Sequence, residues 1–377
     1  MFELMTHYGL QVYWWVILSL LGGLLVFMMF VQGGQTLLGR LAGKDELKKT
    51  MLINSLGRKW ELGFTTLVLF GGAAFAAFPL FYAVSFGGAY AVWMTILFSY
   101  IIQAVAYEYR KKPDNFLGAR TYEIFLLLNG TLATFLIGAA VATFFSGSAF
   151  VVDEYHLSQW KHPLYGLEAL ANPFNWLLGL SLLFLARSLG ALYFINNLDD
   201  AELQSASRES LKKDAPIFLG LFVAFLVWLL LRDGFAYDPL TKEVSMVSFH
   251  YLANLLTMPY VALPVLVGVG LVLYGFYLGI FTGSIKGIWS AGAGTVLTIM
   301  GAFLLVGLGN TAYYPSTYDL QSSLTIENSS GSHYTLTAMA YASLLVPFVL
   351  AYIYYVWKSM DAQKITAEEI RDDSHAY

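Results

Sequence analysis

Nine long apolar runs divide the chain and constrain its fold more than any other feature. About 20 apolar residues in a helix span the hydrocarbon core of a bilayer, where only helices and closed barrels satisfy every backbone polar group. The runs cover residues 9–31, 62–84, 87–107, 122–145, 174–196, 215–231, 258–282, 285–308 and 336–358. The sequence therefore predicts an all-α membrane protein with nine transmembrane helices, forming a single integral membrane domain over residues 1–377.

The composition supports a bilayer protein and excludes several other classes. Hydrophobic residues make up 58% of the chain and charged residues only 12%, which leaves too little polar surface for a water-soluble globule. The net charge of −4 and the lack of a basic stripe argue against a nucleic-acid partner. Cysteine is absent, so the chain can form neither disulfides nor thiolate metal sites.

Lysine and arginine are distributed very unevenly between the two sides of the predicted spans. Of the 21 such residues, 17 fall on one side and three on the other, while Arg187 lies inside a span. Cytoplasmic loops retain these residues. We therefore expect the N-terminus outside and residues 359–377 as a short cytoplasmic tail. The connections 146–173, 232–257 and 309–335, on the outer side, can hold short helices or an ordered cap.

None of the histidines is placed to ligate a haem inside the bilayer, because all six lie outside the spans. We expect them at the membrane interface or in solvent: His7, His156, His162, His250, His333 and His375. The chain also has no phosphate-binding loop, no dinucleotide fingerprint and no spaced metal motif. The sequence therefore predicts neither catalytic residues nor metal ligands in this chain.

Polar side chains near one end of the first three spans are the main candidates for function. Gln32 and Gln35 end the first span, Glu61 begins the second and Glu108 ends the third, all at similar depth. Carboxylates at a membrane surface are suitable proton-entry groups, and amides can hold water without titrating. The four residues are candidates for a proton pathway. The alternative is structural: Glu61 complements the helix dipole and Glu108 pairs with Arg110.

Three further residues are candidates for a supporting role. Trp60 can anchor the helix end beside Glu61, and Lys59 can offset the negative potential there. Arg187 lies near the middle of the fifth span, where a permanent charge is costly. We expect Arg187 to face protein and to meet an acid, a carbonyl oxygen or a cofactor carboxylate.

Several stretches closely resemble subunit II of cytochrome bd-type quinol oxidases, and the similarity covers essentially the whole chain in order. The most specific stretches are "MLINSLGRKWE" with "GGAAFAAFPLFYAVSFGGAY" in residues 51–90, and "YEYRKK" in residues 107–112. The similarity extends through "VDEY" (152–155), "NPFNWLLG" (172–179), "GALYF" (190–194) and "LLVPFVLAYIYYVWKSMDAQKITAEEI" (344–370).

The resemblance implies two four-helix bundles plus one peripheral helix, in the bacterial cytoplasmic (inner) membrane. It implies that this chain ligates no cofactor and that a larger subunit I carries haem b and haem d. The complex would oxidise quinol (ubiquinol or menaquinol) and reduce oxygen to water with cytoplasmic protons, some of them passing through subunit II. Small single-helix accessory subunits and a structural quinone remain open.

One element departs from the family pattern. Many members have an acidic "DGxD"-like element at the end of the first span, where this chain has Gln32 and Gln35. Because amides do not titrate near neutral pH, a proton route would depend on Glu61 and Glu108. Two other functions stay open at this point: an ion-coupled secondary transporter, which needs a binding site at the membrane midplane, and a purely structural membrane subunit.

Overall fold

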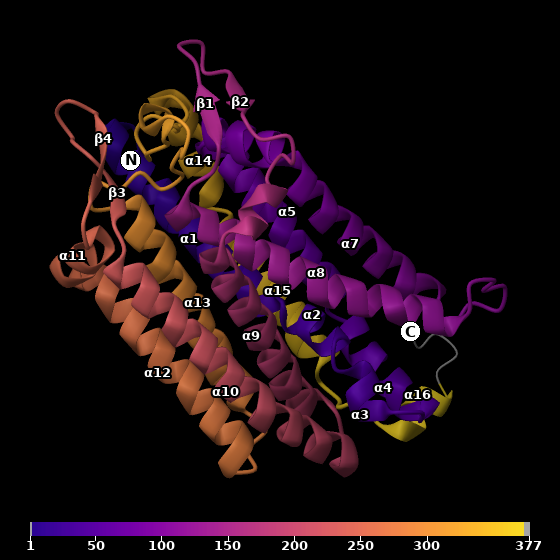
Figure 1. Ribbon diagram of the computed structural model, residues 1–377. Helices are drawn as coiled ribbons and strands as arrows, with labels where there is room; N and C mark the ends of the chain where they lie inside the picture. The colour runs from indigo at the N-terminus through magenta and orange to yellow at the C-terminus, as the bar shows by residue number, and fades with distance from the viewer. Residues whose placement is uncertain (1, 373–377) are drawn as a thin grey trace.

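The computed structural model describes residues 2–372, which fold into long, roughly aligned helices with two small β-hairpins at one end (Figure 1). Nine spans within these residues are long and apolar enough to cross a membrane, which confirms the expected number. They are α1 (His7–Met28) with α2 (Phe30–Gln35), α4 (Glu46–Gly57) with α5 (Trp60–Ala77), α7 (Tyr90–Tyr109), α8 (Ala119–Ser146), α9 (Pro173–Asn197), α10 (Ala201–Leu231), α12 (Pro259–Phe281), α13 (Gly287–Gly307), and α14 (His333–Ser343) with α15 (Val346–Met360).

The spans form two groups of four, with the ninth at the periphery, as expected. The first group contains α1/α2, α4/α5, α7 and α8, and the second contains α9, α10, α12 and α13. The two groups are joined where α1 packs on α13 and where α9 packs on both α2 and α8. The interior polar residues of the first group therefore lie next to α9.

Two helices differ in extent from the apolar runs that predicted them. The run at 215–231 is only the second half of α10, because the helix starts fourteen residues earlier in a polar segment that extends beyond the hydrocarbon core. The run at 62–84 is interrupted at Phe78, since the residue before a proline disfavours helical geometry. The chain continues there as α6 (Pro79–Tyr82) and a π-helical segment, η2 (Ala83–Gly88).

Close packing of the helices depends on small residues. A Cβ atom at Gly33 would overlap the backbone of Ala186 on α9, so α2 and α9 can approach only with glycine there. At Gly275, an added Cβ would crowd Ala291 on α13 in the same way. Both contacts bring backbones together where lipid provides no hydrophobic drive for association.

One end of the molecule, here called the hairpin end, is covered by an ordered cap. Its strands are β1 (Phe150–Val152) paired antiparallel with β2 (Ser158–Trp160), and β3 (Gly234–Tyr237) paired antiparallel with β4 (Val244–Val247). Short helices η1 (Phe2–Leu4), η3 (Leu167–Ala171), α11 (His250–Thr257) and η4 (Leu320–Ser322) complete it. The sequence predicted a cap or short helices here. Strands of three or four residues are too short to show a clear alternating pattern.

The opposite end, here called the basic end, contains α3 (Leu38–Ala42), α4 and α16 (Ala367–Asp372). The segment expected as a tail from residue 359 packs against the helices there. The Asp199 backbone N–H donates to Ile365 at 3.0 Å, and the Ile365 N–H donates to Asn197 at 3.1 Å. These bonds fix the chain after α15 to the connection between α9 and α10.

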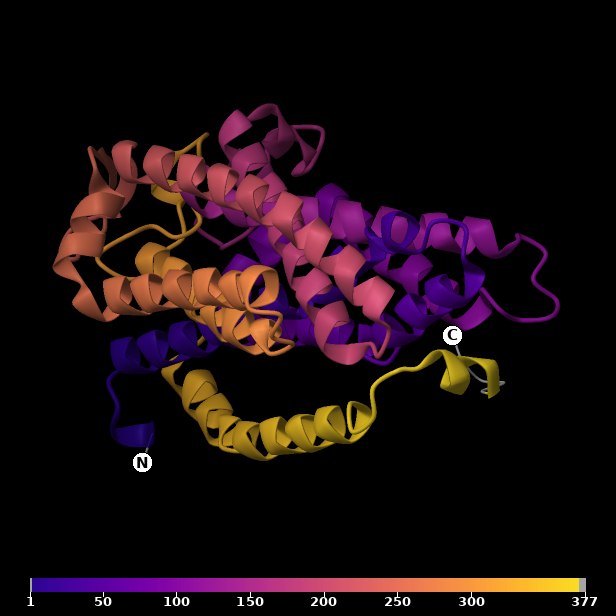
Figure 2. The same cartoon turned by 90° about the horizontal axis from the view of Figure 1, so that it is seen from below.

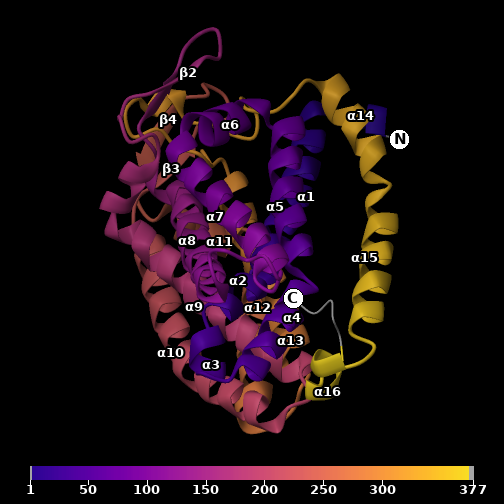
Figure 3. The same cartoon turned by 90° about the vertical axis from the view of Figure 1, so that its right-hand side faces the viewer.

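The ninth span stands apart from the rest of the molecule along most of its length (Figures 2 and 3). No residue of α15 is buried. Near the hairpin end it is held through α14, where Trp14 donates to the Leu336 carbonyl at 3.1 Å and the Tyr13 and Ser343 hydroxyls are 2.5 Å apart. The span is therefore attached at its ends and leaves an apolar surface between them.

Candidate functional site

Amide and phenol side chains from α2 and α7 meet in the interior of the first helix group. Gln35 Nε2 donates to the Tyr107 hydroxyl at 3.1 Å, and Gln32 Nε2 donates to Gln103 Oε1 at 3.5 Å. The three glutamines are at most 1% exposed. These four residues, together with Asn129 of α8, are called the amide tract below.

The amide tract contains more buried polar atoms than its side chains can satisfy. The atoms without a hydrogen-bond partner in residues 2–372 include Gln32 Oε1, Gln35 Oε1, Gln103 Nε2 and Asn129 Oδ1, together with the neighbouring Tyr100 hydroxyl and Trp60 Nε1. An unsatisfied buried polar atom costs about 1–3 kcal/mol. Ordered water normally satisfies such groups. The tract therefore has the chemistry of a hydrated path between helices, built from neutral groups.

Trp60 connects α5 to this tract. Its indole stacks on the Tyr107 ring, with centroids 5.8 Å apart and planes 13° from parallel. This contact packs the start of α5 against α7.

The two candidate acids lie outside the tract. Glu61 in the first turn of α5 and Glu108 near the end of α7 are both exposed, and neither forms an ion pair within residues 2–372. The structure thus brings Gln32 and Gln35 together with Gln103 and not with the two acids. The adjacent Trp60 points inward, so Glu61 lies on the outer face of the same helix.

The alternative in which Glu108 pairs with Arg110 is wrong. The Arg110 guanidinium is turned away from α7's exposed face and binds Glu123 of α8 at 2.8 Å and Glu46 of α4 at 3.1 Å. Glu61 remains in the first helical turn, where a carboxylate complements the helix dipole.

Lys59 lies on a different side of the chain from Glu61. Its ammonium is fully buried, 2.8 Å from Asp361 Oδ1 and above the Trp357 ring. Asn197 also donates to this carboxylate at 3.1 Å, and Ser55 donates to Asn197 at 2.6 Å. The charge of Lys59 is therefore balanced by the segment after α15. The sequence did not predict Asp361 as the partner of Lys59, because Asp361 lies beyond the last apolar run.

Arg187 meets an acid, as predicted. Its guanidinium lies 3.1 Å from Asp214 Oδ2 of α10 and donates to Thr36 Oγ1 at 3.0 Å. Asp214 also accepts from Ser210 at 3.1 Å and lies 3.6 Å from Arg40. Since Thr36 follows Gln35 directly, this ion pair fixes the end of the amide tract. Asp214 itself was not predicted, because it lies at the polar edge of its span.

The described histidines lie in the connections or at the first residues of helices, and one of them differs from the expected exposure. His250 was expected at the interface or in solvent, but it is buried at 8% exposure, 2.9 Å from Thr311 Oγ1 and 3.2 Å from Asn254 Nδ2. Burial lowers the pKa of His250. His375 lies outside the described residues. Within residues 2–372, no three His, Asp or Glu side chains are grouped to hold a metal ion.

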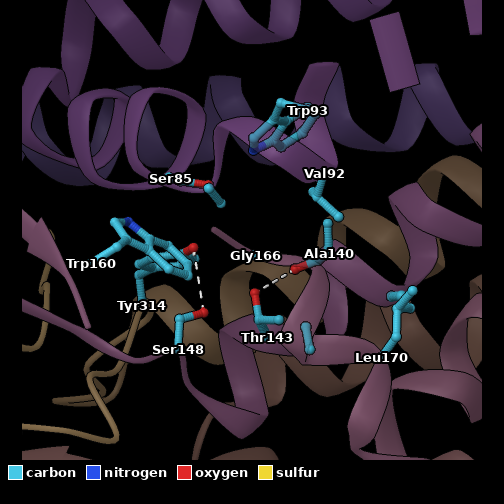
Figure 4. A pocket seen from close by; sticks show the side chains of 13 residues that line it. Ser85, Val92, Trp93, Ala140, Thr143, Ser148, Trp160, Gly166, Leu170 and Tyr314 are labelled. Atoms are coloured by element: carbon cyan, nitrogen blue, oxygen red, sulfur yellow. Dashed lines mark hydrogen bonds between the residues drawn. The ribbon is translucent and has the colours of Figure 1, made fainter. Parts of the chain in front are cut away.

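A small cavity near the hairpin end has room for water only. It has a volume of about 20 Å³ and lies between η2, α7, α8 and the cap (Figure 4). Beside it, the Ser148 hydroxyl donates to the Tyr314 hydroxyl at 3.5 Å, and the Thr143 hydroxyl donates to the Ala140 carbonyl. This volume suits about one water molecule.

Residues 10–360 match the family model described as cytochrome bd terminal oxidase subunit II. This chain belongs to that family. Subunit 2 of the cytochrome bd-I ubiquinol oxidase of Escherichia coli K12 is 29% identical over 385 aligned positions, covering 97% of this chain and 98% of that protein. Subunit 2 of the Bacillus subtilis cytochrome bd ubiquinol oxidase is 26% identical, covering 93% and 96%.

A solved structure shows the same fold. A chain in the structure of the bd oxidase from Geobacillus thermodenitrificans superposes with a TM-score of 0.67 at 16% identity, covering 94% of this chain and 99% of that one. This subunit II is thus a terminal oxidase subunit and a multi-pass protein of the bacterial cytoplasmic membrane. Its described histidines do not fit a haem site inside the bilayer, because they lie in the cap or begin α1, α11 and α14.

Proposed function

We propose that this subunit II binds a larger subunit I that carries haem b and haem d, in a complex that oxidises quinol and reduces oxygen to water. Membership of the family and the names of the relatives support this assignment. Because no histidine of residues 2–372 is placed to ligate a haem inside the bilayer, the contribution of this subunit is assembly and proton uptake.

The surface for subunit I is the exposed apolar side of α5 and α7 together with α15. The ninth span is only 17% buried in its most apolar window, although polar contacts hold both of its ends. Large apolar side chains are exposed on these helices: Val68, Leu69, Phe75, Met94, Phe98, Ile101, Phe348, Val349 and Leu350. Figure 3 shows α15 separated from α1 and α5. A helical partner that packs here would bury both surfaces.

Proton uptake would start at the basic end. With the N-terminus outside, as the distribution of Lys and Arg favours, that end faces the cytoplasm and the tail beyond residue 358 is cytoplasmic. Glu61 and Glu108 are the exposed acids at the ends of α5 and α7, next to the surface proposed for subunit I. Binding of subunit I would shield these acids from solvent while leaving them able to exchange protons.

The amide tract supplies the inner part of the route. The observation that carries this proposal is the group of unpartnered buried atoms around Gln32 and Gln103, because hydrogen-bonded water between neutral groups can pass protons without trapping them. Trp60 and Tyr107 separate this interior from the exposed acids. Lys59 and Arg187 support the route by fixing the helices, since the charge of each is paired.

The test is proton uptake by the reduced complex after mixing with oxygen, with Glu61→Gln and Glu108→Gln. Each change keeps hydrogen bonding and removes titration. We expect unchanged haem content and slower proton uptake in Glu61→Gln, with a smaller effect in Glu108→Gln. Lys161→Gln at the hairpin end is the matched control. Unchanged uptake at every pH in both acid variants would leave subunit II as a structural subunit.

A further inference from the structure

A cleft at the hairpin end combines a free guanidinium, a free carboxylate and aromatic walls. It has a volume of about 330 Å³ and lies where α9 begins, where α10 ends and beside β4. Its lining residues are Asn172, Phe174, Trp228, Arg232, Asp233 and Met246. None of them belongs to the proton route or to the surface proposed for subunit I.

The guanidinium of Arg232 forms no direct ion pair with a carboxylate in residues 2–372, although Asp233 lies nearby. It lies over the Phe174 ring, 4.7 Å from the centroid, and forms no ion pair or side-chain hydrogen bond within residues 2–372. Burial lowers the pKa of Arg232, and the nearby Tyr251 and Asp233 offset this effect only in part. An arginine nevertheless stays charged. Its donors are thus available to an anion that enters the cleft.

Two other polar groups in the cleft are also available. Asp233 is exposed and forms no ion pair in the described part of the chain, although it directly follows Arg232. Asn172 uses its Oδ1 to accept from the Phe174 backbone N–H at 3.0 Å, which leaves its Nδ2 as a donor. The cleft therefore presents donors for an anion and, separately, a carboxylate for a cation.

The position of the cleft in the membrane indicates a ligand with an apolar part. It opens where the apolar half of α10 ends, at the depth where tryptophan collects at the headgroup level. Trp228 and Leu231 are exposed beside it, and Val223 and Val227 continue an exposed apolar ridge along α10 into the bilayer. An acyl chain can lie along this ridge while its headgroup occupies the cleft.

We propose that this cleft binds the headgroup of a phospholipid that carries a primary ammonium, of the phosphatidylethanolamine type. The phosphodiester accepts from Arg232 and from Asn172 Nδ2, and the ammonium donates to Asp233. A phosphatidylglycerol headgroup offers no cation to Asp233, and a choline headgroup has no N–H to donate. The pair of opposite charges on consecutive residues thus selects a zwitterion with a hydrogen-bonding cation.

The experiment is a lipid titration of the purified, delipidated oxidase complex, followed by native mass spectrometry. Phosphatidylethanolamine, phosphatidylglycerol and phosphatidylcholine with identical acyl chains are the probes. We expect phosphatidylethanolamine to bind the wild type most tightly. Arg232→Gln should weaken it by about tenfold, because a charge-assisted phosphate contact is lost. Asp233→Asn should bind phosphatidylethanolamine and phosphatidylglycerol with equal affinity. Lys161→Gln, at the same end of the molecule, is the control that should change neither.

Three results would overturn the proposal. Unchanged phosphatidylethanolamine binding in both Arg232→Gln and Asp233→Asn would remove the cleft as the site. Phosphatidylglycerol binding to the wild type as tightly as phosphatidylethanolamine would refute the role of Asp233. Displacement of the lipid by millimolar inorganic phosphate would show a site for the free anion. Haem content and thermal stability of each variant identify any that fail to fold, and Arg232→Lys then replaces Arg232→Gln, with weaker phosphate binding expected.

Discussion

Replacing Asp214 by asparagine should destabilise the subunit strongly, because the change leaves Arg187 charged inside the helix packing without its counter-ion. The Asp214 side chain is 3% exposed and that of Arg187 is 17% exposed, and they are 3.1 Å apart. Removing one partner of a buried ion pair costs about 3–5 kcal/mol. Arg187 keeps its bond to Thr36 and is partly exposed, so the lower value of about 3 kcal/mol is expected.

Two further variants separate the ion pair from general packing. The double variant Arg187→Met with Asp214→Leu should recover most of the lost stability, because apolar residues of similar volume replace such pairs at little cost. Arg40→Gln is the matched control. Arg40 is 37% exposed and 3.6 Å from Asp214, so its loss should cost about 1 kcal/mol or less.

The assay is unfolding of the purified complex in mixed micelles with increasing sodium dodecyl sulfate, followed by near-ultraviolet circular dichroism. The predicted order of stability is wild type, Arg40→Gln, the double variant and then Asp214→Asn. If the double variant is as unstable as Asp214→Asn, the loss comes from packing and the electrostatic reasoning is refuted.

Three other changes test separate parts of the structure. Lys59→Met should release the segment after α15 from the helices, because Asp361 loses its ion pair. Limited proteolysis should then cut this segment while the other spans stay intact. An unchanged cleavage pattern would contradict this prediction. His250 is buried and its pKa is lowered, so the unfolded state takes up a proton before the folded state as pH falls below about 6.5. The thermal stability of the wild type should therefore fall in this pH range, and that of His250→Gln should fall less. Equal losses of stability in the two proteins would contradict the role of His250. Gln103→Leu should slow oxygen reduction with haem content intact, because it removes two polar atoms from the tract beside Gln32, and unchanged turnover would contradict a route there.

The hydropathy pattern predicted the nine spans because depth in a bilayer is set mainly by apolar run length. It did not predict which way each side chain faces around its helix. Glu61, Glu108 and the glutamines were expected together because they lie at one depth, but the acids face outward and the amides inward. Gln103 was missed for the same reason, since an amide inside an apolar run carries no directional signal.

The sequence predicted that a buried charge would have a polar or charged partner, but it did not predict which residue that partner is. A charged group in mid-span requires an opposite charge or a hydrogen-bond partner, so Arg187 could be expected to meet an acid. That the acid is Asp214 depends on how α10 packs against α9, which no local pattern specifies. Lys59 was expected to offset the negative potential beside Glu61, yet the return of the chain after α15 buries it against Asp361, a residue 302 positions away in the sequence.

We expect the amide tract to hold water that carries protons, as proposed above for this subunit. A cryo-electron microscopy map of the oxidase complex, at a resolution that shows ordered water, tests it most directly. We expect water density within hydrogen-bond distance of Gln32 Oε1, Gln103 Nε2 and Asn129 Oδ1, continuing toward Glu61 or Glu108. A dry tract, in which these amides satisfy one another directly and no water lies between them and the acids, would contradict it.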